Sequence, residues 1–124
     1  MAYEDLEAAR AQYEAIRALI IHHAGGWHDE VVLRKLDFAC AMAAVAVPDR
    51  QCKVHVGAIE DYCRQLYSPT AHLRWARART SGADYLRLQI LRELDAFHAR
   101  LGEIEALRDG GAQRGAADRD RPGK

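Results

Sequence analysis

Residues 38–47 have the sequence FACAMAAVAV, which contains no charged side chain. They form the second half of a segment, from about Asp29 to Val47, that we expect to be one helix. A helix that is apolar on every side either lies in the middle of a bundle or packs against a second subunit. Pro48 and Asp49 follow at once as a compact break, so the next helix is expected to return in the opposite direction. The stretch therefore predicts a bundle of antiparallel helices.

Three other segments carry apolar residues every three or four positions, which is the pattern of a helix with one buried face. They extend from about Tyr3 to His23, from about Arg50 to Tyr67, and from residue 82 to about Arg108. Each segment predicts one helix of the bundle. The expected buried stripes are Leu6, Ala9, Tyr13, Ile16 and Ile20 in the first segment, Cys52, His55, Ile59, Tyr62 and Leu66 in the second, and Ile90, Leu94, Phe97, Leu101 and Ile104 in the third.

Glycine, proline and polar residues mark the boundaries of these helices. Gly25-Gly26 ends the first helix, because glycine readily takes the left-handed conformation that closes a helix. Ser68 and Pro69 are typical of a cap and a first helical residue, and they predict a short helix over residues 69–79. Residues 109–124, DGGAQRGAADRDRPGK, contain no large apolar side chain and are expected to form a disordered tail.

The predicted fold is all-α, an antiparallel helical bundle of four principal helices plus one short helix. The bundle is expected to occupy residues 1–108 as a single domain, with residues 109–124 as the disordered tail. A chain of 124 residues that is 49 % apolar is long enough for one continuous core and too apolar for an intrinsically disordered protein. No apolar run approaches the ~20 residues that a membrane-spanning helix needs, so no membrane partner is expected.

Three cysteines, Cys40, Cys52 and Cys63, lie in helical and apolar surroundings and cannot all pair with one another. The first residues also lack the basic start and the apolar stretch of a secretory signal. Both features favour a reducing compartment, in which the cysteines serve as small buried side chains. They predict a cytoplasmic protein.

The charged residues are balanced in number and uneven in position. The chain holds 18 basic and 18 acidic residues, which argues against the simplest non-specific nucleic-acid binder. Residues 1–62 contain ten acids and six bases, a balance of −4, whereas residues 63–124 contain eight acids and twelve bases, a balance of +4. This asymmetry indicates charge matching within the chain, between two copies, or with a partner.

Residues 62–83 contain no acid, and within them Arg74, Trp75, Arg77 and Arg79 form a candidate partner-binding patch. Arginines beside an exposed aromatic side chain suit phosphate contacts and base stacking, which is the argument for nucleic acid. If Trp75 is buried against the bundle instead, the same arginines form a solvated face or a surface for an acidic protein.

The turn after the first helix contains a cluster of candidate ligands, His22, His23 and His28. Neutral imidazole is a good ligand for zinc, copper and iron, so these residues are a candidate metal or haem site. The alternative is helix capping. Histidines suit the negative end of one helix dipole, and Asp29 with Glu30 suit the positive start of the next.

The common catalytic motifs are missing from the sequence, which contains no G-x-G-x-x-G, G-x-x-x-x-G-K-[ST], H-E-x-x-H or C-x-x-C. Cys52 and His55 offer a nucleophile and a base on one helical face. A buried thiol and a hydrogen-bonded imidazole are the commoner explanation of such a pair. An enzyme is therefore not favoured, and no cofactor is predicted.

These observations favour a small, non-enzymatic helical interaction module that self-associates into a homo-oligomer or binds another protein. One alternative is a metal- or haem-binding sensor that uses His22, His23 and His28, and another is a nucleic-acid-binding accessory protein that uses the arginine patch. The residues expected to serve packing or self-association are Ala39, Ala43, Val47, Ile90, Leu94, Phe97 and Leu101.

Overall fold

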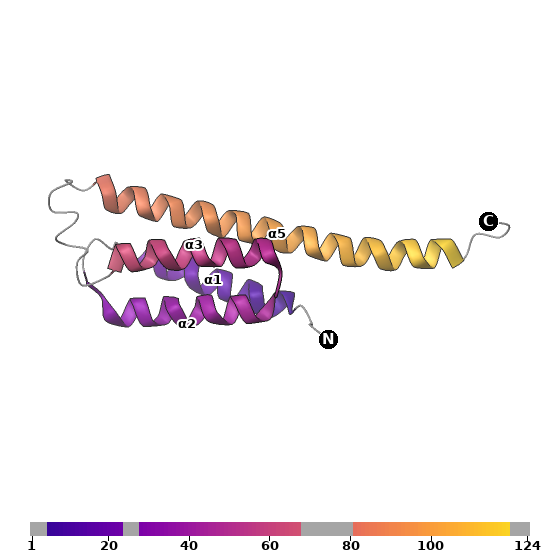
Figure 1. Ribbon diagram of the computed structural model, residues 1–124, viewed down its shortest axis with the longest axis horizontal. Helices are drawn as coiled ribbons and strands as arrows, with labels where there is room; N and C mark the ends of the chain where they lie inside the picture. Colours follow the sequence, from indigo (N-terminus) through magenta and orange to yellow (C-terminus); the bar gives the residue numbers. More distant parts are fainter. Residues whose placement is uncertain (1–4, 24–27, 68–80, 120–124) are drawn as a thin grey trace.

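The computed structural model describes residues 5–23, 28–67 and 81–119 (Figure 1). The elements in these ranges are four helices, α1 (Leu6–His22), α2 (Glu30–Ala46), α3 (Arg50–Tyr67) and α5 (Ser81–Arg119). The prediction of an all-α chain is therefore confirmed for the described residues. The short helix predicted over residues 69–79 lies outside them.

The helices pack side by side, and α1 and α3 each contact both α2 and α5. Two backbone hydrogen bonds join helix ends. The N–H of Asp5 donates to the carbonyl of Ala46 at 2.8 Å, so α1 begins beside the end of α2. The N–H of Asp29 donates to the carbonyl of Tyr67 at 3.1 Å, so α2 begins beside the end of α3. Figure 1 shows that α5 follows the length of the other helices and continues past them.

One core runs along the bundle and receives side chains from every helix. The stripes predicted for the first and last helices are confirmed, because every side chain in them is buried. The helix α2 contributes Val32, Leu36, Ala39, Cys40 and Ala43, and Val47 follows at its end. The uncharged stretch 38–47 therefore supplies part of the core.

The stripe predicted for α3 is only partly correct. His55 and Tyr62 are half-buried rather than buried, and apolar neighbours take the inner positions. Both polar side chains sit at the edge of the buried face, where a polar atom avoids the cost of full burial. The buried side chains of α3 are Cys52, Val56, Ile59, Cys63, Leu66 and Tyr67.

An aspartate caps each of the first three helices. Asp5, Asp29 and Asp49 each accept a hydrogen bond from the backbone N–H three residues later, at 2.9, 3.1 and 3.0 Å respectively. Each bond satisfies an N–H group that has no partner within the helix. The capping role expected for Asp29 is thereby confirmed.

The helix α5 continues beyond Arg108, where the tail was expected to begin, and ends at Arg119. The structure therefore differs from the sequence expectation for residues 109–119, which are helical. Glycines in this stretch cost about 1 kcal/mol each relative to alanine but do not prevent helical hydrogen bonds, as proline does. The first proline after Arg108 is Pro122, beyond the end of the helix. Figure 1 shows this part of α5 extending past the other helices.

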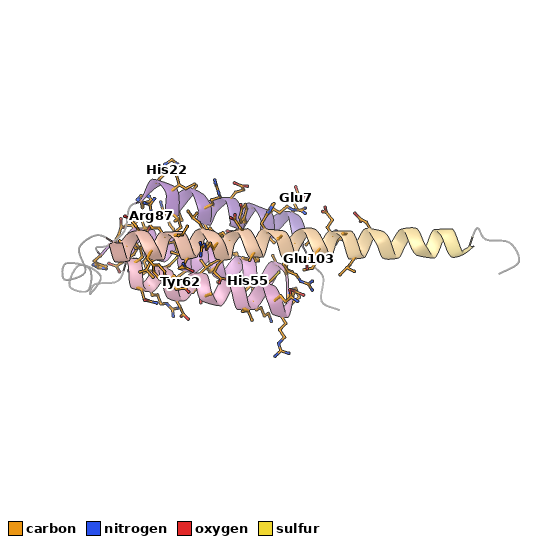
Figure 2. All side chains as sticks on the ribbon, turned by 90° about the horizontal axis from the view of Figure 1, so that it is seen from above. Glu7, His22, His55, Tyr62, Arg87 and Glu103 are labelled. Atoms are coloured by element: carbon orange, nitrogen blue, oxygen red, sulfur yellow. The ribbon has the colours of Figure 1, made fainter. Side chains whose placement is uncertain are left out.

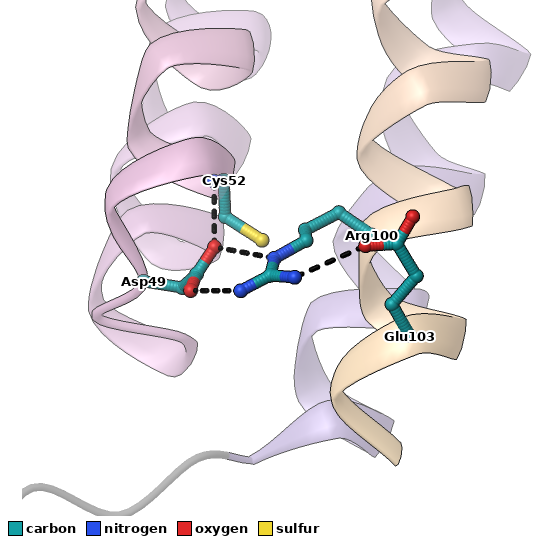
Figure 3. A network of polar contacts seen from close by, with 4 residues as sticks. All are labelled: Asp49, Cys52, Arg100 and Glu103. Carbon is teal, nitrogen blue, oxygen red and sulfur yellow. Dashed lines mark hydrogen bonds and ion pairs between the residues drawn. The ribbon is translucent and has the colours of Figure 1, made fainter. Parts of the chain in front are cut away.

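Asp49 also joins the start of α3 to α5 (Figure 3). Arg100 donates from Nε and Nη2 to the two carboxylate oxygens of Asp49 at 3.1 and 3.0 Å, and from Nη1 to Glu103 at 3.0 Å. The side chains of Arg100 and Asp49 are only 20 % and 17 % exposed, so solvent screens this pair less than an open surface pair. The hydrogen bonds from Arg100 lower the pKa of Asp49 to about 2.

We predict that Asp49→Ala lowers the free energy of unfolding by about 2–3 kcal/mol, because it removes a helix cap and leaves Arg100 without its paired charge. Asp49→Asn should cost less, since asparagine also caps helices. Denaturant unfolding at pH 7 measures both values, with Asp61→Ala on the exposed side of α3 as the control. A loss for Asp49→Ala no larger than that of the control would contradict the assigned role.

The pair also predicts a pH dependence. The pKa of Asp49 is about 2 in the folded chain against an ordinary value of 3.8, so its charged form stabilises the folded state above about pH 4. This stabilisation should be lost as the pH falls from about 4 to about 2. The difference in unfolding free energy between the wild type and Asp49→Asn should therefore shrink across that range. A constant difference would exclude the charge as its source.

Candidate functional site

The side of α2 that points away from the core is also apolar. Val31 and Phe38 are each 64 % exposed, Met42 is 38 % exposed and Val45 is 74 % exposed. We call these four side chains the outer face of α2. Val31, Phe38 and Val45 are seven residues apart, so they follow one line along the helix, like equivalent positions of a heptad. Arg34 and Lys35 are also exposed and lie between Val31 and Phe38. Several large apolar side chains exposed along one side of a helix are typical of an interaction surface.

A groove with a volume of about 630 Å³ lies between α1 and α2 on the outside of the bundle. Phe38 belongs both to this groove and to the outer face of α2. The residues that line the groove are Gln12, Ala15, Ala18, Leu19, His22, His23, Arg34, Lys35, Phe38 and Ala39.

The two ends of the groove differ in charge. Because α1 begins beside the end of α2, the end of α1 lies near the start of α2. His22 therefore shares one end of the groove with Arg34 and Lys35, whereas Phe38 lies further along α2. Figure 2 shows His22 at the end of the bundle where α5 begins, and Glu7 toward the opposite end. The half of the groove toward His22 therefore contains all four of its basic side chains, and we call it the basic end, although Ala18 and Leu19 line it as well.

The residues predicted for packing or self-association all lie inside the single chain. Each of the seven is at most 3 % exposed. They pack between α2 and its neighbours and between α5 and its neighbours, so they present no surface to a second molecule. The surface of α2 that is available to a partner is its outer face, which the sequence pattern did not distinguish from the buried face.

The predicted histidine cluster is spread over the ends of two helices. His22 is the last residue of α1, His23 follows as its cap, and His28 precedes Asp29, the cap of α2. Among the residues that the structure describes, no three His, Cys, Asp or Glu side chains are arranged to hold a metal ion. His22 and His23 line the groove, and His28 does not.

The predicted arginine patch, Arg74, Trp75, Arg77 and Arg79, lies outside the described residues. Its role in binding nucleic acid or an acidic protein stays a prediction.

The pair Cys52 and His55 has two separate environments. The Cys52 side chain is buried in the core. His55 is half-buried and points to α5, where its Nδ1 lies 2.7 Å from Oε2 of Glu93. This contact joins α3 to α5. The Asp49–Arg100 pair joins the same two helices at the start of α3. The imidazole therefore holds two helices together.

The other two thiols are packing groups. Cys40 and Cys63 are both fully buried, and burial raises the pKa of Cys40 to about 12 and that of Cys63 well above its ordinary value. Because the thiolate is the reactive form of cysteine, neither side chain is suited to nucleophilic chemistry at neutral pH.

Two residues that the sequence did not single out hold the ends of the α1–α2 connection. The hydroxyl of Tyr67 donates to the carbonyl of His23 at 2.7 Å, and the carbonyl of Tyr67 accepts from the N–H of Asp29 at 3.1 Å. Arg87 donates to the carbonyl of Ile20 at 3.1 Å, which satisfies a carbonyl in the last turn of α1. These contacts fix the basic end of the groove.

Comparison of the chain with protein-family models, with curated proteins and with solved structures finds no match. Within the described residues, no helix combines the length and the apolar composition needed to cross a membrane. The candidate site is therefore argued from its own geometry.

We predict that Tyr67→Phe lowers the free energy of unfolding by about 1 kcal/mol, because the carbonyl of His23 loses its hydrogen-bond donor while the ring stays buried. Denaturant unfolding measures the loss. Tyr62→Phe, the same change on a half-buried ring of α3, is the matched control and should have less effect. Equal effects of the two substitutions would contradict the role assigned to the Tyr67 hydroxyl.

Proposed function

We propose that this chain is an antiparallel four-helix bundle that acts as a non-enzymatic interaction module and self-associates through the outer face of α2. The observation that carries the proposal is the exposure of Val31, Phe38 and Val45, at 64 %, 64 % and 74 %. Water contact with side chains of this size is unfavourable, and a partner that covers them removes the cost.

The spacing of these residues favours a second copy of the chain as the partner. Val31 and Val45 are equally far from Phe38 along the helix. If two α2 helices pair in opposite directions with Phe38 on the two-fold axis, Val31 of each copy meets Val45 of the other. A surface that matches itself in this way is what a two-fold dimer requires.

The charges of α2 favour the same orientation. Its charged residues, Glu30, Arg34, Lys35 and Asp37, all precede the uncharged stretch 38–46. In an antiparallel pair, the charged half of one helix lies opposite the uncharged half of the other, so like charges do not meet. A parallel pair would place each lysine beside its own counterpart, which is unfavourable.

The size of the outer face indicates a weak dimer. Val31, Phe38 and Val45 of the two copies are six partly exposed side chains. Covering each contributes about 1–2 kcal/mol, or about 6–12 kcal/mol together. Association costs at least about 4 kcal/mol in lost translation and rotation. The surplus corresponds to a dissociation constant that is micromolar at the strongest.

The polar contacts of the described helices support a non-enzymatic role. Asp49 with Arg100, His55 with Glu93, and Arg10 with Glu105 at 2.8 Å each join two helices of the bundle. Their functional groups are therefore engaged in holding the fold together.

The sensor hypothesis keeps one specific observation in its favour. His22 and His23 line a groove whose other walls are largely apolar. Structural zinc sites use four protein ligands, whereas a single histidine holds haem iron. Haem is therefore the form of this alternative that the groove favours.

We predict that the wild-type chain, with a mass of 13.9 kDa, approaches twice that mass in light scattering as its concentration rises through the micromolar range. Val45→Glu should keep the mass at the monomer value, because it places a charge opposite Val31 of the second copy. Val45 is exposed, so the substitution should leave the thermal unfolding of the monomer intact.

Val54→Glu is the matched control, because Val54 on α3 is 63 % exposed and lies on a different helix from the outer face of α2. It should leave dimer formation unchanged. A wild-type chain that stays monomeric at every concentration, or equal loss of the dimer in Val45→Glu and Val54→Glu, would overturn the proposal.

A further inference from the structure

We propose that the groove between α1 and α2 binds a single-chain amphiphile, an unbranched alkyl chain that ends in an anionic group, with the anion at the basic end of the groove. The proposal goes beyond self-association and does not rest on it. The two share Phe38, and Arg34 and Lys35 lie between Val31 and Phe38 on the exposed side of α2, so residues on the α1 side of the groove test the ligand separately.

The charges that line the groove select an anion. Arg34, Lys35, His22 and His23 line it, and no aspartate or glutamate does. No carboxylate of the described residues lies within ion-pair distance of Lys35. Arg34 pairs with Glu30 at 2.6 Å, but both side chains are more than half exposed, so this pair is worth little and can be exchanged for a ligand.

The rest of the lining suits an alkyl chain. Because α1 begins beside the end of α2, Ala15 lies close to the level of Phe38, whereas Ala18 and Leu19 lie close to the level of Arg34. Gln12 is the only polar side chain level with Phe38 and Ala39. All four basic side chains lie in the half of the groove toward His22, and apolar side chains continue into the other half, so a molecule with one charged end and one apolar end fits the lining. A uniformly apolar ligand would leave the basic end without a partner.

The dimensions of the groove fit a slender ligand. Along α1 the lining extends from Gln12 to His23, which at 1.5 Å per residue is about 16 Å. The volume of about 630 Å³ lies within the range typical of small-molecule sites. An extended chain of about a dozen carbons matches the length without exceeding the volume.

The test is calorimetric titration of the full chain with dodecanoate, below the concentration at which it forms micelles. Dodecyltrimethylammonium, with the same alkyl length and the opposite charge, is titrated in parallel. We expect one dodecanoate per chain, bound about tenfold or more tightly than the cationic amphiphile, because only the anion pairs with Lys35 and Arg34.

Two substitutions separate the parts of the groove. Lys35→Glu should weaken dodecanoate about tenfold, and Ala18→Phe should abolish its binding by filling the middle of the groove. Both positions are exposed, so a thermal unfolding curve that matches the wild type shows that the fold is kept. Lys53→Glu, the same charge change on the exposed side of α3, is the control and should leave the affinity unchanged.

Three results would overturn the proposal. The first is the absence of saturable dodecanoate binding, and the second is equal affinity for the two amphiphiles. The third is an affinity for dodecanoate that Ala18→Phe leaves unchanged. If dodecanoate fails to bind while hemin binds with a Soret band that His22→Ala removes, the groove is a haem site instead. The dimer mass of Ala18→Phe shows whether self-association stands independently of these outcomes.

Discussion

The apolar character of α2 on both its sides is the constraint on which this structure depends. A helix in a four-helix bundle can turn only one side toward the core, and α2 turns Leu36, Cys40 and Ala43 inward. Its uncharged stretch leaves apolar side chains on the other side as well. The stretch 38–47 contributes Ala39, Cys40, Ala43 and Val47 to the core, and it also exposes Phe38, Met42 and Val45 to water. The self-association that we propose would remove that conflict.

Much of the fold follows from local sequence patterns. The stripes of the first and last helices were predicted correctly because regular spacing at three and four residues leaves one possible inner face. In α3, two neighbouring rows of residues match the helical spacing almost equally well. The row with Val56 and Cys63 is the buried one, because it buries no polar group. The cap at Asp29 was readable from its place before a helix. The contacts of Arg100 with Asp49 and of Arg87 with Ile20 join residues far apart in the chain, so no local pattern identifies them.

The candidate site was less accessible to sequence analysis. The uncharged stretch indicated either burial in a bundle or contact with a second subunit, and the structure gives α2 a buried side and an exposed side. Which alanines and valines face outward depends on where α1 and α3 pack, and composition does not encode that. The histidines were noticed for their ligand chemistry. Their place beside Arg34 and Lys35 on one groove became visible only once α1 and α2 lay next to each other.

The most direct test of the central claim is disulfide cross-linking between copies that carry single cysteines on the outer face of α2. The native cysteines are buried, so they should not compete under mild oxidation. The two-fold antiparallel pairing predicts that Val31→Cys chains mixed with Val45→Cys chains form a covalent dimer in which one copy of each is joined. No cross-link above the level of a Val54→Cys control, or cross-links only between identical chains, would contradict this pairing of α2.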